Sequence, residues 1–330
     1  MQKENKTGNG ITEGTIWKQI LLFFFPILFG TLFQTLYNTV DAVIVGQFLG
    51  KEALAAVSGG TGTTINLVIG FFVGISSGAA VILSQHYGAK NEELVERSLH
   101  TALAISIYSG VAVSILGYLF TNPLLHWIDT PEDILPLAST YLHVYFGGAL
   151  SIVVYNMGAG IYRAIGDSKH PLYFLIAGSF VNIALDILFI AVLHRGVRGA
   201  AEATIISQFF SAFLTLYFLY RRTDSCALKP RKMLFIDKRI ASFMIKLGVP
   251  GGIQSVMYSL SNMLIQTNVN RFGTDTAAAW ASYGKLDVIF WMIVNAFGIS
   301  ITTFVGQNYG AGRIDRARRG LKECFGMTML

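Results

Sequence analysis

The chain has 330 residues, of which 53% are apolar and 13% are charged, and its formal net charge is +6. The mean hydropathy is +0.53. Soluble globular domains carry about 25% charged residues, so this composition excludes an ordinary soluble domain and indicates a membrane protein. The basic excess does not indicate a nucleic-acid partner, because nothing in the basic loops matches a base-reading motif.

Long apolar blocks follow one another along the chain. Each is long enough to supply the roughly 20 helical residues that cross a hydrocarbon core. We therefore predict an all-α polytopic membrane protein. The predicted spans are residues 17–40, 58–83, 94–120, 134–156, 172–193, 197–220, 240–266 and 282–305, and a ninth begins near residue 316.

Lys and Arg gather in alternate loops of this arrangement. Most of the 25 basic residues lie in the N-terminus and in loops 84–97, 160–171, 221–246 and 307–322. The positive-inside rule predicts that these segments are cytoplasmic, in a multi-pass protein of the cell membrane. Residues 1–16 are polar and the first apolar block is too long for a signal peptide, so we expect a cytoplasmic N-terminal tail and no cleavage.

The chain repeats itself after 224 residues. Pro26 aligns with Pro250, and the Gly-Ile-Ser sequence at 74–76 aligns with the one at 298–300. After a slip of two residues, Gln85 aligns with Gln307. Ordered anchors of this kind favour two copies of one unit, which is a recurrent plan of transporters. The alternative is that apolar, glycine-rich helices resemble each other by chance.

Six spans fit within one repeat. Because six is even, both copies have the same orientation, and we expect a pseudo-twofold axis along the membrane normal. We predict an N-lobe over residues 17–220, a cytoplasmic linker over residues 221–239 and a partial C-lobe over residues 240–330. Leu330 aligns with a position inside the third span, so we expect an incomplete second lobe, about eight or nine helices and a truncated product. A native eight-span protein with a short apolar tail is the alternative.

Two acidic residues lie within apolar sequence. Asp186 is near the middle of its span, and Asn182 one turn earlier shares its helix face. Asp41 ends the first span, and the polar Thr204 lies in the sixth. Intramembrane acids are costly and usually functional, and an amide and a carboxylate offer oxygen ligands for Na⁺ or a site for a proton. The alternatives are hydrogen bonding between helices and, for Asp41, an interfacial position.

Polar residues recur at helical spacing in the first span of each copy. They are Gln34, Tyr37 and Asn38 in the first span, and Gln254, Tyr258 and Asn262 in the seventh. This spacing places each set on one stripe of its helix. With the aromatic and methionine residues that accompany them, they suit an amphipathic organic cation, so we predict a substrate cavity here. An ordinary helix interface is the alternative.

Prolines and glycines indicate structural roles. Pro26 and Pro250 lie inside equivalent spans, where proline frees a carbonyl and favours a kink. Gly70, Gly74 and Gly78 recur every four residues, which lets another helix approach closely.

Several motifs are absent from the sequence. It contains no phosphate-binding G-x-x-x-x-G-K-[ST] loop, no nucleophile elbow and no H-E-x-x-H. Neither Cys226 nor Cys324 indicates a disulfide or a metal site, and the six histidines lack metal-ligand spacing. We therefore expect that the protein is not an enzyme and needs no cofactor, and that it binds no metal beyond a coupling Na⁺.

Three segments resemble the multidrug and toxic compound extrusion (MATE) family. Residues 38–50 resemble the end of its first helix and the loop that follows. The sequence GIYRAIGDSKHP at 160–171 resembles its loop between helices four and five, and residues 306–311 resemble its loop after helix eight. The resemblance implies twelve helices in two lobes, and a cation-coupled antiporter that exports organic compounds.

The resemblance also implies site residues. In the DinF-like and archaeal branch, the N-lobe holds the cation at positions that match Asp41, Asn182, Asp186 and Thr204. A second branch uses a glutamate on helix seven, where this chain has no acid. We expect structural or conformational roles for Pro26, Pro250, Gly74, Arg163, Gly166 and Pro171.

The sequence thus predicts an alternating-access antiporter driven by Na⁺ or H⁺. The expected partners are small organic substrates and membrane lipid, without nucleic acid or an obligate protein partner. A flippase of lipid-linked saccharides is one alternative, and it would favour Lys or Arg in the cavity, with Lys285 as the main candidate. A non-transporting fragment is the other.

Overall fold

The computed structural model describes residues 11–128, 130–270, 272 and 274–329, and these contain no β-strand. The α-helices are α1 (Ile16–Leu49), α2 (Lys51–Ser58), α3 (Gly60–Gly88), α4 (Glu92–Trp127), α5 (Leu135–Gly147), α6 (Ala149–Ala164), α7 (Lys169–Asp186), α8 (Gly196–Tyr220), α9 (Lys238–Asn270), α10 (Thr274–Gly310) and α11 (Ile314–Met329). A π-helical segment, Ile187–Val192, continues α7, and a 3-10 turn, Pro230–Lys232, lies between α8 and α9.

The predicted spans are confirmed as long apolar helices. Within the described residues, seven helices could cross a membrane, and α5 with α6 would make an eighth. These two helices meet at an angle of 52°, at the Gly147–Gly148 pair, and glycine is a common cause of such breaks. The first span is longer than predicted, because the helix continues to Leu49 and ends where Gly50 adopts a φ of 86°.

Two further helices are short. The sequence did not predict α2, which follows α1 directly. The predicted ninth span corresponds to α11, which has 16 residues. Six of its first ten residues are charged: Asp315, Arg316, Arg318, Arg319, Lys322 and Glu323.

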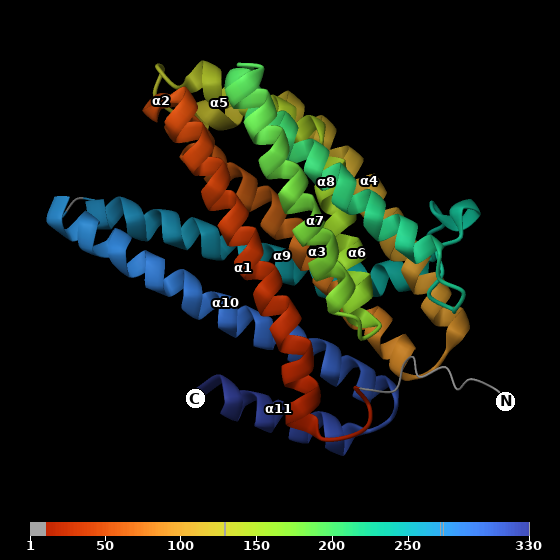
Figure 1. The fold of residues 1–330 in the computed structure, drawn as a ribbon. Coiled ribbons are helices and arrows are strands. Elements are labelled where there is room, and N and C mark those ends of the chain that lie inside the picture. The colour runs from red at the N-terminus through yellow and green to blue at the C-terminus, as the bar shows by residue number, and fades with distance from the viewer. Residues whose placement is uncertain (1–10, 129, 271, 273, 330) are drawn as a thin grey trace.

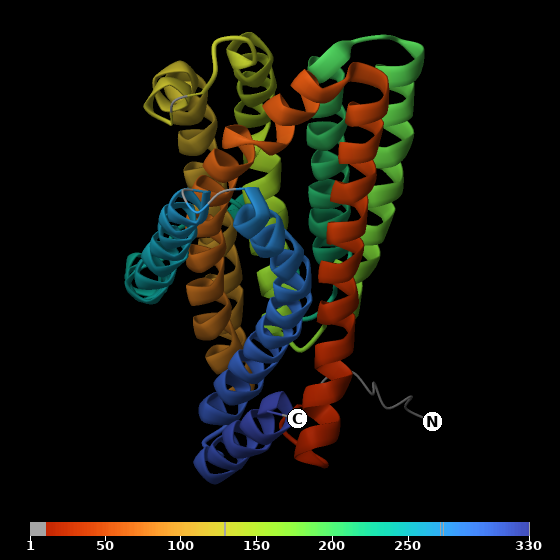
Figure 2. The ribbon, with the colours of Figure 1, turned by 90° about the vertical axis from the view of Figure 1, so that its left-hand side faces the viewer.

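The helices form two groups in space. Helices α1 and α3–α8 make a bundle, and α9 and α10 run obliquely across it (Figure 1). The amphipathic α11 lies beside the start of α1, as the view turned by 90° also shows (Figure 2). The predicted boundaries of the two lobes and the linker remain predictions.

The predicted glycine stripe of α3 packs against α9. A Cβ on Gly74 would overlap the backbone of Gly252, and one on Gly78 would lie 2.5 Å from the backbone nitrogen of Gly248. Side chains at these positions would force the two helices apart. Gly74 therefore allows the backbones of α3 and α9 to touch.

A second close contact joins equivalent positions of the two copies. A Cβ on Gly88 would overlap the carbonyl oxygen of Gln307, and a Cβ on Gly310 would overlap that of Gln85. The slip-corrected repeat relates Gln85 to Gln307 and Gly88 to Gly310, so the two contacts are reciprocal. Reciprocal contacts of this kind are the signature of a twofold axis, which here passes between the ends of α3 and α10.

Residues 11–15, which we call the N-terminal strap, connect α1 to the α10–α11 corner. Arg316 donates hydrogen bonds to the carbonyl oxygens of Gly14 (2.8 Å) and Glu13 (3.0 Å). Arg313 donates to the carbonyl oxygen of Thr12 (2.6 Å). The Ile11 side chain would lie 3.2 Å from a Cβ on Gly166. The strap therefore bridges the α6–α7 loop and the second repeat.

Candidate transport site

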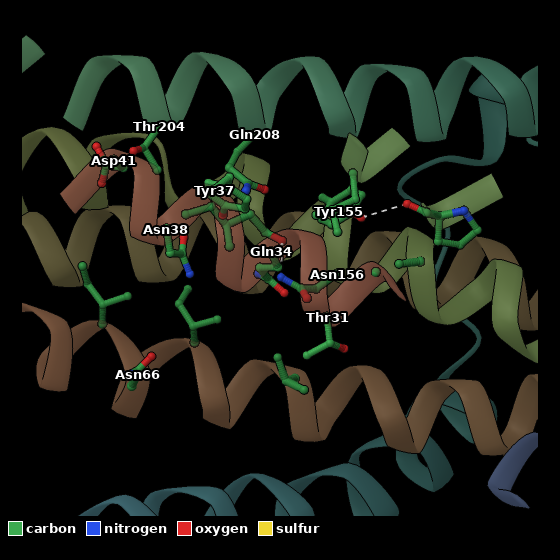
Figure 3. A pocket seen from close by; sticks show the side chains of 18 of the residues that line it. Thr31, Gln34, Tyr37, Asn38, Asp41, Asn66, Tyr155, Asn156, Thr204 and Gln208 are labelled. Carbon is green, nitrogen blue, oxygen red and sulfur yellow. Dashed lines mark hydrogen bonds between the residues drawn. The ribbon is translucent and has the colours of Figure 1, made fainter. Parts of the chain in front are cut away.

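A cavity of about 550 Å³ lies inside the helix bundle, and we call it the bundle cavity. Its wall comes mainly from α1, α3, α5, α6, α7 and α8. Most of its polar lining is shown in Figure 3: Thr31, Gln34, Tyr37, Asn38, Asp41, Asn66, Tyr155, Asn156, Thr204 and Gln208. The volume lies in the range that holds drug-sized ligands.

One face of α1 supplies the longest polar wall. Thr31, Gln34, Asn38 and Asp41 recur every three or four residues and all line the cavity, as helical periodicity requires. In Figure 3, Tyr37 lies between Gln34 and Gln208 of α8, and Asp41 lies beside Thr204. The first-span half of the predicted substrate wall therefore faces the cavity.

The structure brings the two predicted acids together. Asp186 is fully buried and Asn182 is 1% exposed. The carboxyl groups of Asp41 and Asp186 lie close enough to interact with each other. Even so, Asp41 Oδ1, both carboxyl oxygens of Asp186 and both polar atoms of Asn182 are buried without a hydrogen-bond partner of good geometry.

The unsatisfied oxygen atoms of this group are of the kind that could coordinate a small cation. Leaving buried polar atoms unpaired costs about 1–3 kcal/mol each, and more for charged groups. Carboxylate, amide and hydroxyl oxygens are the ligands of hard cations such as Na⁺. Among the described residues, no three His, Cys, Asp or Glu side chains are grouped so that they could hold a metal ion.

A break in helix geometry lies directly beside the acids. Asp186 is the last residue of α7, and the π-helical segment begins at Ile187. Isolated π turns inside helices are often found at functional sites. The sequence offered no signal for this turn, because residues 187–192 are simply apolar.

The second half of the predicted substrate wall lies elsewhere. Gln254, Tyr258 and Asn262 are exposed on α9 and do not line the bundle cavity. The Tyr258 ring packs edge-on against Trp291 of α10, with centroids 5.5 Å apart. The structure therefore separates these residues from Gln34, Tyr37 and Asn38.

The residues with predicted structural roles also fall into separate places. Pro26, Arg163 and Pro171 line the bundle cavity, whereas Pro250 is exposed on α9. Gly166 has a φ of 90°, a conformation that favours glycine, and it lies at the N-terminal strap outside the cavity.

The sequence did not lead us to predict three amide side chains of the cavity. Asn66, Asn156 and Gln208 line it from α3, α6 and α8. Each is a single polar residue in an apolar helix, which is the signal that could have identified them. Gln208 follows Thr204 by four residues, so the two share one face.

The MatE family profile matches residues 26–188 and 250–330. The two segments begin at Pro26 and Pro250, the pair that the internal repeat aligns. Together they cover more than half of the chain, which establishes the family.

Individual relatives agree with the family match. The chain is 30% identical to the "Probable multidrug resistance protein YoeA" of Bacillus subtilis over 94% of its own length and 68% of that protein's. It is 26% identical to an "FAD transporter" of Shewanella oneidensis, covering 96% and 70% of the two chains.

The fold has a close counterpart among solved structures. A structure described as "MATE in the bent conformation" matches with a TM-score of 0.89 and 25% identity, over 98% of this chain and 72% of that one. Profile, relatives and fold agree, and the chain belongs to the MATE family of multidrug efflux transporters.

Proposed function

We propose that the protein is a cation-coupled antiporter that exports organic cations by alternating access, with Na⁺ or H⁺ as the coupling ion. Members of this family are transporters and not enzymes. The single observation that carries the coupling is the buried, unsatisfied pair of Asp41 and Asp186. Two carboxylates in a low-dielectric site cannot both remain ionised without a proton or cation between them.

In this proposal, Asp41, Asn182, Asp186 and Thr204 bind the coupling ion, which enters from outside. Occupancy removes the repulsion between the carboxylates and changes how α1 packs against α7 and α8. Because the same α1 face lines the bundle cavity, ion binding and substrate binding compete for one helix. Competition of this kind is what exchange of ion for substrate requires.

Substrate size and chemistry follow from the cavity. Its tyrosine, amide and carboxylate lining suits an amphipathic organic molecule with a basic group. The names of relatives refer to both multidrug resistance and FAD transport. Among the described residues that line the cavity, Arg163 is the one basic residue, and this part of the lining does not form the basic cluster expected for a flippase that holds pyrophosphate.

The Asp186→Asn variant tests the coupling. It keeps the side-chain shape and removes the charge, so we expect loss of gradient-driven export, with Asp41→Asn next in severity. The measurement is export of a fluorescent organic cation from vesicles that contain the full-length gene product, under an imposed Na⁺ or pH gradient.

Asp133→Asn is the matched control. Asp133 lies outside the predicted spans and accepts a hydrogen bond from the backbone nitrogen of Ile134 at 3.1 Å, and asparagine retains that acceptor. We expect export at the wild-type rate. Wild-type export by Asp186→Asn would show that coupling resides elsewhere.

A further inference from the structure

Arg163 gives the bundle cavity a charge of opposite sign to that of the Asp41 carboxylate. It occupies the last turn of α6 and lines the cavity together with Tyr155, Ser168 and Pro171. A guanidinium stays charged in a protein and presents five N–H donors. A cavity whose other titratable lining groups are tyrosines and Asp41 therefore contains a fixed positive charge.

This charge has no partner in the described part of the chain. No salt bridge joins Arg163 to an acidic side chain. The neighbouring Tyr155 hydroxyl interacts with it electrostatically, but that hydroxyl donates its own hydrogen bond to the carbonyl oxygen of Pro171, at 3.2 Å. Charged groups away from bulk water are normally paired, so an unpaired guanidinium in a cavity wall marks a position where an anion would be favourable.

The two charges lie at opposite ends of the cavity. In Figure 3, Asp41 lies at one end, and Tyr155 lies beyond Gln34 and Asn156 toward the other. Arg163 lies two turns further along α6, in its last turn, and three residues before Gly166, which lies against Ile11 just ahead of α1. The cavity-lining residues of α1 run from Pro26 to Ala42, roughly 24 Å along a helix axis. The cavity is thus elongated and polarised.

We propose that Arg163 binds an acidic group of the exported compound, so that the bundle cavity takes a zwitterionic amphiphile. A carboxylate or phosphate of the compound lies at Arg163, and its basic group points toward Asp41. One planar guanidinium pairs bidentately with one acidic group. This assignment rests on the proposed function only in identifying the occupant of the cavity as the exported compound.

A pair of dyes that differ only at the acid provides the test. Rhodamine 110 carries a free carboxylate, and rhodamine 123 is its methyl ester. Fluorescence anisotropy would give the dissociation constants of both dyes for the detergent-purified full-length gene product. We expect the wild type to bind the acid roughly tenfold more tightly than the ester, which corresponds to about 1.4 kcal/mol.

Variants at Arg163 then separate charge from shape. Arg163→Gln should abolish the preference, because it weakens binding of the acid dye and leaves the dissociation constant of the ester dye within about twofold of the wild-type value. Arg163→Lys should retain part of the preference. Arg221→Gln removes the same charge from the exposed end of α8 and should leave both constants unchanged. If Arg163→Gln does not fold, the wild-type ratio and Arg163→Lys decide the question.

Three results would overturn the assignment. The first is that the wild type binds the acid and the ester with equal affinity. The second is that Arg163→Gln weakens binding of both dyes equally. The third is that Arg163→Gln keeps the full preference for the acid. Displacement of rhodamine 110 by dihexanoyl phosphatidylglycerol, but not by dihexanoyl phosphatidylcholine, would assign the acidic group to a lipid instead. Because binding requires no gradient, failure of ion-coupled export with an intact acid preference would contradict the proposed function alone.

Discussion

At the scale of single residues, burial gives similar side chains different roles. Gln34 on α1 and Gln254 on α9 are both glutamines in the first span of a repeat. Gln34 lines the bundle cavity, whereas Gln254 lies on an exposed face of α9. The pair therefore tests whether the bundle cavity or the α9 face contacts substrate.

We expect Gln34→Ala to change the range of exported compounds and to weaken dye binding by roughly 1 kcal/mol, the typical worth of one hydrogen bond. Gln254→Ala should change neither, because its side chain is outside the cavity. Drug-resistance profiles of cells that express each variant provide the measurement. If only Gln254→Ala changed the drug-resistance profile, the polar stripe of α9 would be the substrate site.

Cys226 shows the effect of burial on reactivity. It lies in the segment between α8 and α9 and is fully buried, and this burial raises the pKa of its thiol to about 12. Only the thiolate reacts with maleimides. At pH 8 we therefore expect labelling of Cys226 to be more than about 100-fold slower than after denaturation.

The control for this measurement is a nearby exposed thiol. In a Cys324→Ser background, Thr223→Cys combined with Cys226→Ser places a cysteine at an exposed position three residues away. That cysteine should react at the rate of a free thiol. Equally fast labelling of Cys226 would mean that the segment around it opens readily.

At the scale of elements, the two copies of the repeat pack differently. Gly74 of α3 and Gly298 of α10 are equivalent in sequence. A Cβ on Gly74 would overlap the α9 backbone, whereas a Cβ on Gly298 would have no neighbour within 4 Å. The α3–α9 contact therefore has no equally tight counterpart between α10 and α1, which instead meet through side chains such as the stacked rings of Phe24 and Phe297.

This asymmetry predicts opposite effects of one substitution. Gly74→Ala should lower the free energy of unfolding by roughly 1–3 kcal/mol, because it overpacks a helix contact. Gly298→Ala should be neutral or stabilise the protein by up to about 1 kcal/mol, since alanine favours helix. Thermal unfolding in detergent compares them, and equal destabilisation of both would contradict the asymmetric packing.

At the scale of the whole molecule, two contacts between the repeats lie at one end of the bundle. The reciprocal contact of α3 and α10 and the N-terminal strap both lie where α1 begins. Arg316 donates hydrogen bonds to the carbonyl oxygens of Glu13 and Gly14 and also lies 5.4 Å above the Phe304 ring. For this end to open, the hydrogen bonds between Arg316 and the strap must break or move with it.

Arg316→Gln should therefore favour opening of this end. We expect the open population to rise roughly five- to thirty-fold, equal to about 1–2 kcal/mol. Spin labels at Lys90 and Arg318, both exposed, would report it as a longer distance component in pulsed electron resonance.

Arg319→Gln is the control, because it removes the same charge from the same helix and Arg319 is exposed. We expect an unchanged distance distribution. Identical distributions for Arg316→Gln and wild type would show that the strap does not restrain the opening.

Most of the fold could be predicted from local sequence. Apolar blocks of about 20 residues predicted the spans because a hydrocarbon core requires them, and aligned prolines and glycines predicted the repeat. Helix periodicity also placed Gln34, Tyr37 and Asn38 on one stripe of the first span.

Tertiary structure decided what periodicity could not. The sequence identified Asp41 and Asp186 separately, and only the packing of α1 against α7 and α8 places their carboxyl groups together and leaves them unsatisfied. Tertiary packing also turns the polar stripe of α9 away from the cavity. It leaves Arg163 facing the cavity without a partner among the described residues. A helix pattern fixes which residues share a face, but the neighbour of that face depends on contacts between segments far apart in the chain.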